Sequence, residues 1–209
     1  NVPVGDSLAV RGVLQTTSHD GFSQSNSIDG GYDLNDADNV NARISALWEA
    51  SDDLSVLLSS QHYTDNSNGS ALKALDDPNE DPRVVSQDYP AKIDMTMDIS
   101  TAIVTWELPW ATLKSTTSYQ DMQHAQSFDS DRSDFENFGG YDHVATWSTW
   151  AETTVQELSL SSKSGGMFDW VIGAFYLKSK SGQYVVEYKG TDINDPIEIL
   201  PQDLAPEDI

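Results

Sequence analysis

Alternation of apolar and polar side chains is the feature of this sequence that most constrains its fold. The clearest stretch has Val40, Ala42, Ile44, Ala46 and Trp48 alternating with Asn41, Arg43, Ser45, Leu47 and Glu49. Because successive side chains of an extended strand point to opposite faces, this pattern predicts a strand with one apolar and one polar face. Its length suits a strand that crosses a membrane, which needs about 9–11 residues.

The same pattern recurs along the chain and predicts about seven strands. We expect them to begin near residues 8, 40, 54, 94, 112, 153 and 170. A further short strand is expected over 184–188, and no amphipathic helix or low-complexity linker interrupts the series. The predicted fold class is therefore all-β: an antiparallel meander of about seven transmembrane strands, one unit over residues 1–209 and part of a larger outer-membrane β-barrel.

Short and long connections between these strands alternate. The short ones are 50–53, 108–111 and 163–169, and the long polar ones are 18–38, 64–92 and 127–151. Polar loops of such length would otherwise count against the strand assignment. They are expected in an outer-membrane barrel, which has short periplasmic turns on one side and long extracellular loops on the other. We expect the turns near Asp52, Pro109 and Gly166 at one end of the sheet, and the loops near Gly30, Asp77 and Phe138 at the other.

Each strand is expected to turn its apolar side chains outward and its polar ones toward the lumen, because lipid cannot hydrate a charge. The predicted outward, convex set is Val40, Ala42, Ile44, Ala46, Trp48, Val56, Leu58, Ile99 and Ile103. The predicted lumenal, concave set is Asn41, Arg43, Ser45, Glu49, Ser59, Gln61, Asp98 and Ser100. The lumen-facing polar site residues are thus Arg43, Glu49, Gln61 and Asp98.

Aromatic residues gather beside the short turns. Trp48, Trp110 and Trp170 lie at or next to them and are expected to form a girdle at one membrane interface. The opposite girdle is assigned to Tyr63, Tyr119, Trp147 and Trp150. Trp106 does not fit, because alternation places it on the inward face together with Asp98.

Composition excludes several functions. The net charge of −23 argues against nucleic-acid binding and indicates a solvated acidic surface or loops that attract cations. The chain has no cysteine, no stretch apolar enough for a membrane helix and no signal peptide at its start. The four histidines lack ligand spacing, and the acidic run 129–134 lacks the central glycine of a calcium loop. We therefore expect neither an enzyme nor a cofactor or metal site.

Four local patterns together resemble a known family, the TonB-dependent receptors of Gram-negative outer membranes. The segment 1–11 resembles a periplasmic turn leading into a strand, and 41–54 resembles the hairpin that follows. The segment 156–162 resembles the family's Q-E-L-R-L-x-S strand, with Ser159 in place of the usual arginine, and 168–176 resembles the next strand. The patterns occur in the family's order and span nearly the whole chain.

This resemblance implies an energy-coupled receptor in the outer membrane of a Gram-negative bacterium. Members have an N-terminal plug inside a barrel of about 22 strands. The implied function is uptake of scarce nutrients such as ferric siderophores. The implied partners are outer-membrane lipid, the small-molecule ligand and an energy-transducing periplasmic protein. By comparison with the family, this chain is expected to supply roughly the third to ninth barrel strands, without the plug.

Two other functions are compatible with the same patterns. A passive, porin-like diffusion channel also has short turns, long loops and alternating strands. A secreted, soluble β-sandwich that serves binding or adhesion would place its apolar residues in a dry core between two sheets.

Overall fold

The computed structural model describes residues 1–135, 142–190 and 197–199. These residues form strands and connections and contain no helix. The described part of the chain therefore has no helix that could cross a membrane. The strands are β1 (Val2–Pro3), β2 (Leu8–His19), β3 (Ser23–Ser25), β4 (Tyr32–Leu34), β5 (Ala37–Ser51), β6 (Leu54–Asp65), β7 (Val84–Val85), β8 (Lys92–Glu107), β9 (Ala111–Asp129), β10 (Asp142–Ser162), β11 (Val171–Gly190) and β12 (Ile197–Ile199).

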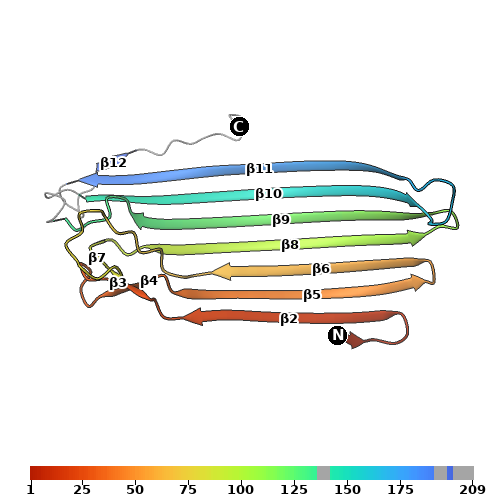
Figure 1. The fold of residues 1–209 in the computed structure, drawn as a ribbon, viewed down its shortest axis with the longest axis horizontal. Coiled ribbons are helices and arrows are strands. Elements are labelled where there is room, and N and C mark those ends of the chain that lie inside the picture. Colours follow the sequence, from red (N-terminus) through yellow and green to blue (C-terminus); the bar gives the residue numbers. More distant parts are fainter. Residues whose placement is uncertain (136–141, 191–196, 200–209) are drawn as a thin grey trace.

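Most strands belong to one antiparallel sheet in the order β1-β2-β5-β6-β8-β9-β10-β11-β12. Its seven long strands, β2, β5, β6, β8, β9, β10 and β11, follow one another in chain order (Figure 1). The predicted antiparallel meander of seven strands is therefore confirmed. Over the described residues the sheet is open, and no second sheet covers either of its faces in the manner of a sandwich.

Two strands are longer than expected. β10 begins at Asp142 rather than near residue 153, because it continues to pair with β9 as far as Val144 opposite Asp129. β11 runs without a break through 184–188, so the separate strand predicted there is wrong. Both strands extend because the backbone N–H and C=O groups of each pair with those of the other along its whole length. The third long connection is correspondingly reduced to residues 130–141.

The connections lie at the predicted ends of the sheet. The turns near Asp52, Pro109 and Gly166 are at one end, and the connections near Gly30 and Asp77 are at the other (Figure 1). The sixth point, Phe138, lies outside the described residues. The sheet therefore has a turn end and a loop end.

Two of the long connections fold together at the loop end. β3 and β4 come from residues 20–36, β7 comes from residues 66–91, and they form a three-stranded sheet in the order β4-β3-β7. The turn between β3 and β4 requires positive φ at Gly30 and Gly31. Glycine adopts positive φ readily because it has no Cβ atom. Leu34, Val85 and Ala91 form a buried apolar cluster here, against which Phe128 of β9 packs. We call residues 20–36 and 66–91 the loop cap.

Buried apolar side chains are confined to the ends of the molecule. Within the described residues they are Leu34, Val85, Ala91, Ala111, Val144, Ala145 and Val186. None of these lies in the middle of the long strands, so the main sheet has no dry core against either face. Large apolar side chains on those strands are instead exposed, which a water-soluble sheet rarely tolerates over a wide area.

Candidate functional site

The strand register divides the long strands into two faces, because directly opposed residues of paired strands point to the same side. Trp48 is opposite Leu8 and Val56, and Val56 is opposite Val104. We call this side the Trp48 face. Arg43 lies on the other side, opposite Gln61, and we call that side the Arg43 face.

The Trp48 face carries a zone that is uncharged on every long strand but β11, where Lys178 lies opposite Thr154, and we call this zone the apolar band. Its residues are Leu8, Val10, Gly12 and Leu14; Ala42, Ile44, Ala46 and Trp48; Leu54, Val56, Leu58 and Ser60; Ser100, Ala102, Val104 and Trp106; Leu113, Ser115, Thr117 and Tyr119; Thr154, Gln156, Leu158 and Leu160; and Ile172, Ala174 and Tyr176. Along one strand it spans about 20 Å, at roughly 3.3 Å per residue. Ile44, Trp48 and Leu58 are 59%, 51% and 52% exposed, so the band is an open surface.

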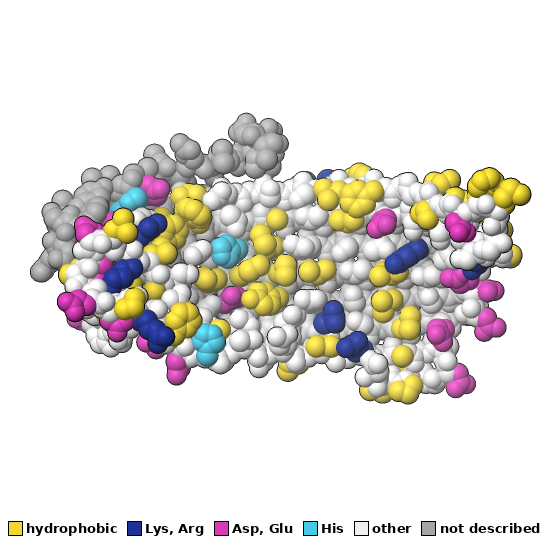
Figure 2. Space-filling model, in the orientation of Figure 1, with side chains coloured by type: hydrophobic (Ala, Val, Ile, Leu, Met, Phe, Trp, Pro, Cys, Tyr) yellow, Lys and Arg dark blue, Asp and Glu magenta, His cyan; other side chains and the backbone are white. Residues whose placement is uncertain are grey.

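At the same heights the Arg43 face is charged. It carries Arg11, Arg43, Glu49, Lys114 and Glu157, each of which alternates with residues of the apolar band. Figure 2 shows one face of the molecule, on which separate basic and acidic side chains interrupt the apolar ones and acidic side chains gather at both ends. The two faces therefore present different environments at the same height along the strands.

The predicted lumenal residues do not all share one face. Arg43, Glu49 and Gln61 lie together on the Arg43 face, as predicted. Asp98 is opposite His62 and lies on the Trp48 face, so its assignment beside Arg43 is wrong. Ser100 lies with Asp98, whereas Ile99 and Ile103 lie on the Arg43 face, so all three assignments are also wrong.

The reason for the error is the phase of β8. Alternation within a strand identifies residues that share a face, but it does not say which face that is. Apolar residues occupy both faces of β8, and the register places Trp106 with Asp98 on the Trp48 face. The relation between Trp106 and Asp98 was predicted, and only their common face was misassigned. Trp106 consequently joins the apolar band.

Asp98 belongs to a line of polar side chains across the Trp48 face, just beyond the apolar band on the loop side. Directly opposed positions place His62, Asp98, Asp121, Glu152 and Lys180 side by side on five strands, and we call them the charged row. His62 Nδ1 lies 2.8 Å from Asp98 Oδ1. The charged row and the turns thus bound the apolar band on its two sides.

The three tryptophans predicted as a girdle lie at the turn end. Trp48 is near the end of β5, and Trp110 and Trp170 come from neighbouring turns with their rings 6.3 Å apart. Lys163 links the same two turns through an ion pair with Glu107. An amphipathic ring at this position suits the boundary between headgroups and acyl chains.

The opposite girdle is not a single belt. Tyr119 and Trp150 lie on the Trp48 face, whereas Tyr63 and Trp147 lie on the Arg43 face. Trp147 contacts the ring of Phe128 edge-on, with centroids 5.2 Å apart. The assignment of all four residues to one girdle is therefore wrong.

Side chains on the Arg43 face shield one another in the centre of the sheet. Every residue of β6 and β8 on that face is half-buried. On the Trp48 face of the same strands, Leu58, Ser60, His62, Asp98 and Ser100 are among the exposed residues. Side chains converge on the inside of a curved sheet and diverge on its outside, so this difference is typical of a concave Arg43 face.

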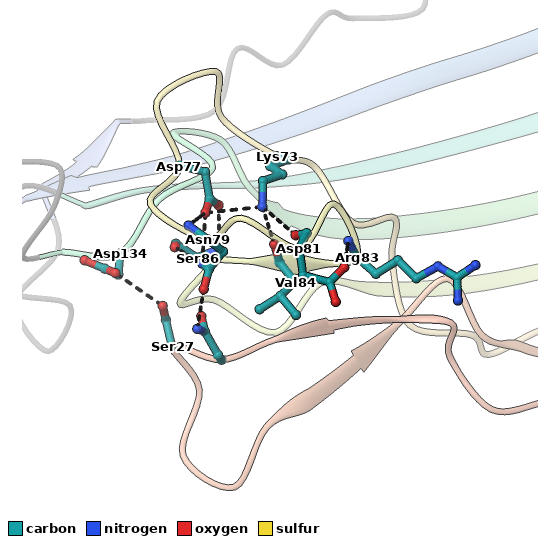
Figure 3. A network of polar contacts seen from close by, with 10 residues as sticks. Ser27, Lys73, Asp77, Asn79, Asp81, Arg83, Val84, Ser86 and Asp134 are labelled. Atoms are coloured by element: carbon teal, nitrogen blue, oxygen red, sulfur yellow. Dashed lines mark hydrogen bonds and ion pairs between the residues drawn. The ribbon is translucent and has the colours of Figure 1, made fainter.

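Carboxylates hold the loop cap together by accepting backbone hydrogen bonds. Asp77 accepts from the backbone N–H of Asn79 and of Ser86, at 2.8 and 2.9 Å, and lies 3.5 Å from Lys73 Nζ (Figure 3). Burial favours a raised pKa for Asp77, but these hydrogen bonds and the lysine outweigh it and lower the pKa. Asn79 also accepts a hydrogen bond from Asn26, which ties the two connections of the cap to each other.

Asp129, at the loop end of β9, is buried among other acids. It accepts hydrogen bonds from the backbone N–H of Asp88 and of Arg132, at 3.0 and 2.7 Å. Burial, followed by the charge of Asp131, raises the pKa of Asp129 to about 8. Through these hydrogen bonds Asp129 joins the loop cap to the connection that follows β9.

The loop cap is the part of the site that sequence reasoning missed. Tyr32–Leu34 and Val84–Val85 are short alternating or β-branched segments, too brief to stand out from the polar residues around them. The pairing of Ser23–Ser25 with Val84–Val85 joins residues about 60 positions apart, because Gln24 lies opposite Val84. Nothing local in the sequence specifies such a contact.

Across the described residues, no group of three or more His, Cys, Asp or Glu side chains is arranged to hold a metal ion. Comparison with protein families, curated proteins and solved structures finds no match. The function proposed below therefore depends on the geometry of the two faces and on the residue patterns.

Proposed function

We propose that this chain is part of the wall of an outer-membrane β-barrel receptor that imports a scarce nutrient, with the Trp48 face toward lipid and the Arg43 face toward the lumen. The observation that carries the proposal is the contrast between the faces at equal height. Five charged residues occupy the Arg43 face there, whereas the Trp48 face carries one, Lys178 of β11, at the edge of the apolar band next to the charged row.

Lipid explains this contrast better than water does. An arginine at the bilayer midplane costs about 2–4 kcal/mol, so selection removes charges from a lipid-facing band and tolerates them in a wet interior. The band's length of about 20 Å along the strand is comparable with the roughly 25 Å apolar zone of outer-membrane barrels. The exposed Ile44, Leu58 and Ile172 would be costly in a soluble protein.

The turn end and the loop end of the sheet also fit a strand that crosses the outer membrane. Short turns with tryptophans suit the periplasmic boundary, and the acidic loop cap suits the extracellular side. Phe128, on the Arg43 face, packs against the cap, so the cap lies beside the mouth of the proposed lumen. The ordered patterns that resemble TonB-dependent receptors favour an energy-coupled receptor, with a ferric siderophore as the expected class of ligand.

Single-cysteine variants test the orientation cleanly, because the chain has no cysteine of its own. Ile44→Cys and Ser45→Cys would each carry an environment-sensitive fluorophore in vesicles that contain nitroxide-labelled lipid. We expect strong quenching at residue 44 and little at residue 45, although the two are adjacent. Equal quenching at both, or none at residue 44, would refute the lipid-facing assignment. Leu58→Cys and Ser59→Cys form a second matched pair.

A passive channel is the second candidate, because the same wall would serve a diffusion pore. Polar side chains such as Gln61 and Gln120 among the charges of the Arg43 face are typical of a water-filled lumen. Ligand accumulation in cells before and after collapse of the proton gradient separates the two functions. Loss of accumulation supports the receptor, and unchanged equilibration supports the channel.

A further inference from the structure

Three of the chain's four methionines lie side by side on the Arg43 face. Met97 of β8 is directly opposite Met122 of β9, and in the adjacent position Met95 is directly opposite His124. These four residues form a rectangle of neighbouring side chains, all half-buried. Alternation within each strand places Met95 with Met97, and Met122 with His124, on a common face. The register between β8 and β9 then brings these two pairs side by side.

The surroundings of the rectangle suit a cation. Asp65 of β6 is directly opposite Met95, and its carboxylate accepts hydrogen bonds from Tyr63 and Ser67, so a negative charge lies next to the rectangle on β6. The Nδ1 atom of His124 lies 3.4 Å from Thr149 Oγ1, which orients the imidazole on this face. The rectangle lies between the position of Arg43 and the loop end, on the same face as Phe128, against which the loop cap packs.

The spacing allows all four side chains to reach one ion. Opposed residues in a sheet have Cβ atoms about 5 Å apart, and diagonal neighbours are about 7–8 Å apart. A methionine side chain has three rotatable bonds and a polarizable sulfur, so its thioether can move to the centre of such a rectangle. Three thioethers and one imidazole would then surround a single position.

We propose that Met95, Met97, Met122 and His124 form a binding site for a soft monovalent metal ion, Cu(I) in the cell. Thioether sulfur selects Cu(I) over harder cations such as Mg²⁺ or Ca²⁺, and imidazole is a good additional ligand for copper. The site differs from the usual carboxylate, cysteine or histidine clusters, because most of its donors are thioethers. Metal binding itself does not depend on the membrane, whereas the location of the site in a lumen rests on the proposed function.

Silver(I) is a suitable probe, because it has the ligand preference of Cu(I) and does not oxidise in air. The full chain, folded in detergent and carrying ¹³C-methyl methionine, would be titrated with silver nitrate in chloride-free buffer. We expect the methyl signals of Met95, Met97 and Met122 to shift together at one equivalent. The signal of Met167, 90% exposed in the turn between β10 and β11, should stay in place.

Substitutions then test each donor. Leucine preserves the volume of methionine, so Met97→Leu and Met122→Leu should retain the fold while weakening silver binding at least tenfold. The triple variant at 95, 97 and 122 should lose binding, and Met167→Leu should leave it unchanged. His124→Asn should weaken binding, with His62→Asn on the other face as its control. Circular dichroism checks the fold of each variant.

Two results would overturn the site. One is a triple variant that binds silver as tightly as the unchanged protein, and the other is a titration in which Met167 shifts as much as the other three methionines. The methyl spectrum of the unchanged protein decides the question even where a variant fails to fold. Failure here leaves the lipid-quenching result at residues 44 and 45 untouched, so the two proposals fail separately.

Discussion

His62 of β6 and Asp98 of β8 form a hydrogen bond on the Trp48 face, with Nδ1 and Oδ1 2.8 Å apart. Both side chains are more than half exposed, so the pair contributes little to stability, between about 0 and 1 kcal/mol. The position of the pair matters more than its energy. His62 and Asp98 are the β6 and β8 members of the charged row, which marks the limit of the apolar band toward the loop end.

The charged row predicts the depth of the sheet in a bilayer. Leu113, Thr117 and Asp121 lie on the same face of β9 at increasing distance from the turn end. With a fluorophore on a single cysteine at each position, we expect quenching by acyl-chain nitroxides at residues 113 and 117. At residue 121 we expect quenching by a water-soluble reagent instead. Lipid quenching at residue 121 would contradict this depth.

Ile44→Arg should oppose insertion of the sheet. The substitution puts a charge into the apolar band, at a cost of about 2–4 kcal/mol if the residue is near the bilayer midplane. Ser45→Arg changes the neighbouring residue on the Arg43 face and should cost less than about 1 kcal/mol. Unfolding from vesicles in urea measures both variants, and similar losses of stability would argue against two different environments.

Leu34→Ala should loosen the loop cap. Leu34 is 1% exposed, and removal of a buried leucine side chain costs about 2–5 kcal/mol. Trypsin should then cut faster after Lys73 and Arg83, the two basic residues of the cap's second connection. Leu75→Ala is the matched control, because Leu75 is fully exposed and its removal should leave the rate unchanged.

Asp129 makes the loop end sensitive to pH. Its pKa is raised to about 8, chiefly by burial, so between about pH 4 and pH 8 the folded protein holds a proton that the unfolded chain has lost. Stability from this group is therefore complete below about pH 4 and declines as the pH rises toward 8. Asp129→Asn, which stays neutral, should flatten the decline.

The measurement for Asp129 is the free energy of unfolding in urea at several pH values. The unchanged protein should lose at least about 1.4 kcal/mol more than the Asn variant between pH 5 and pH 8, which corresponds to one pKa unit. Parallel curves for the two proteins would show that Asp129 ionises as it does in the unfolded chain.

Sequence periodicity predicts the strands of this protein well, and their relation to one another less well. The alternation at Val40–Trp48 is long and regular, so the strand and both of its faces were predicted. In β8 apolar residues occupy both faces, and assigning Ile99 and Asp98 required the pairing with β6, which is a property of two strands. The loop cap depends on contacts between distant segments, and its short strands have no periodicity of their own.

The parallel pairing of β3 with β7 has a consequence for folding. Gln24 and Val84 belong to different connections, and the β2–β5 and β6–β8 hairpins bring them close together. A slip of one residue in either hairpin would displace one partner, because every side chain then changes face. Closing such a distant contact is entropically costly and slow. The loop cap should therefore be among the last parts to form, and its completion would select chains whose hairpins are already in the correct register.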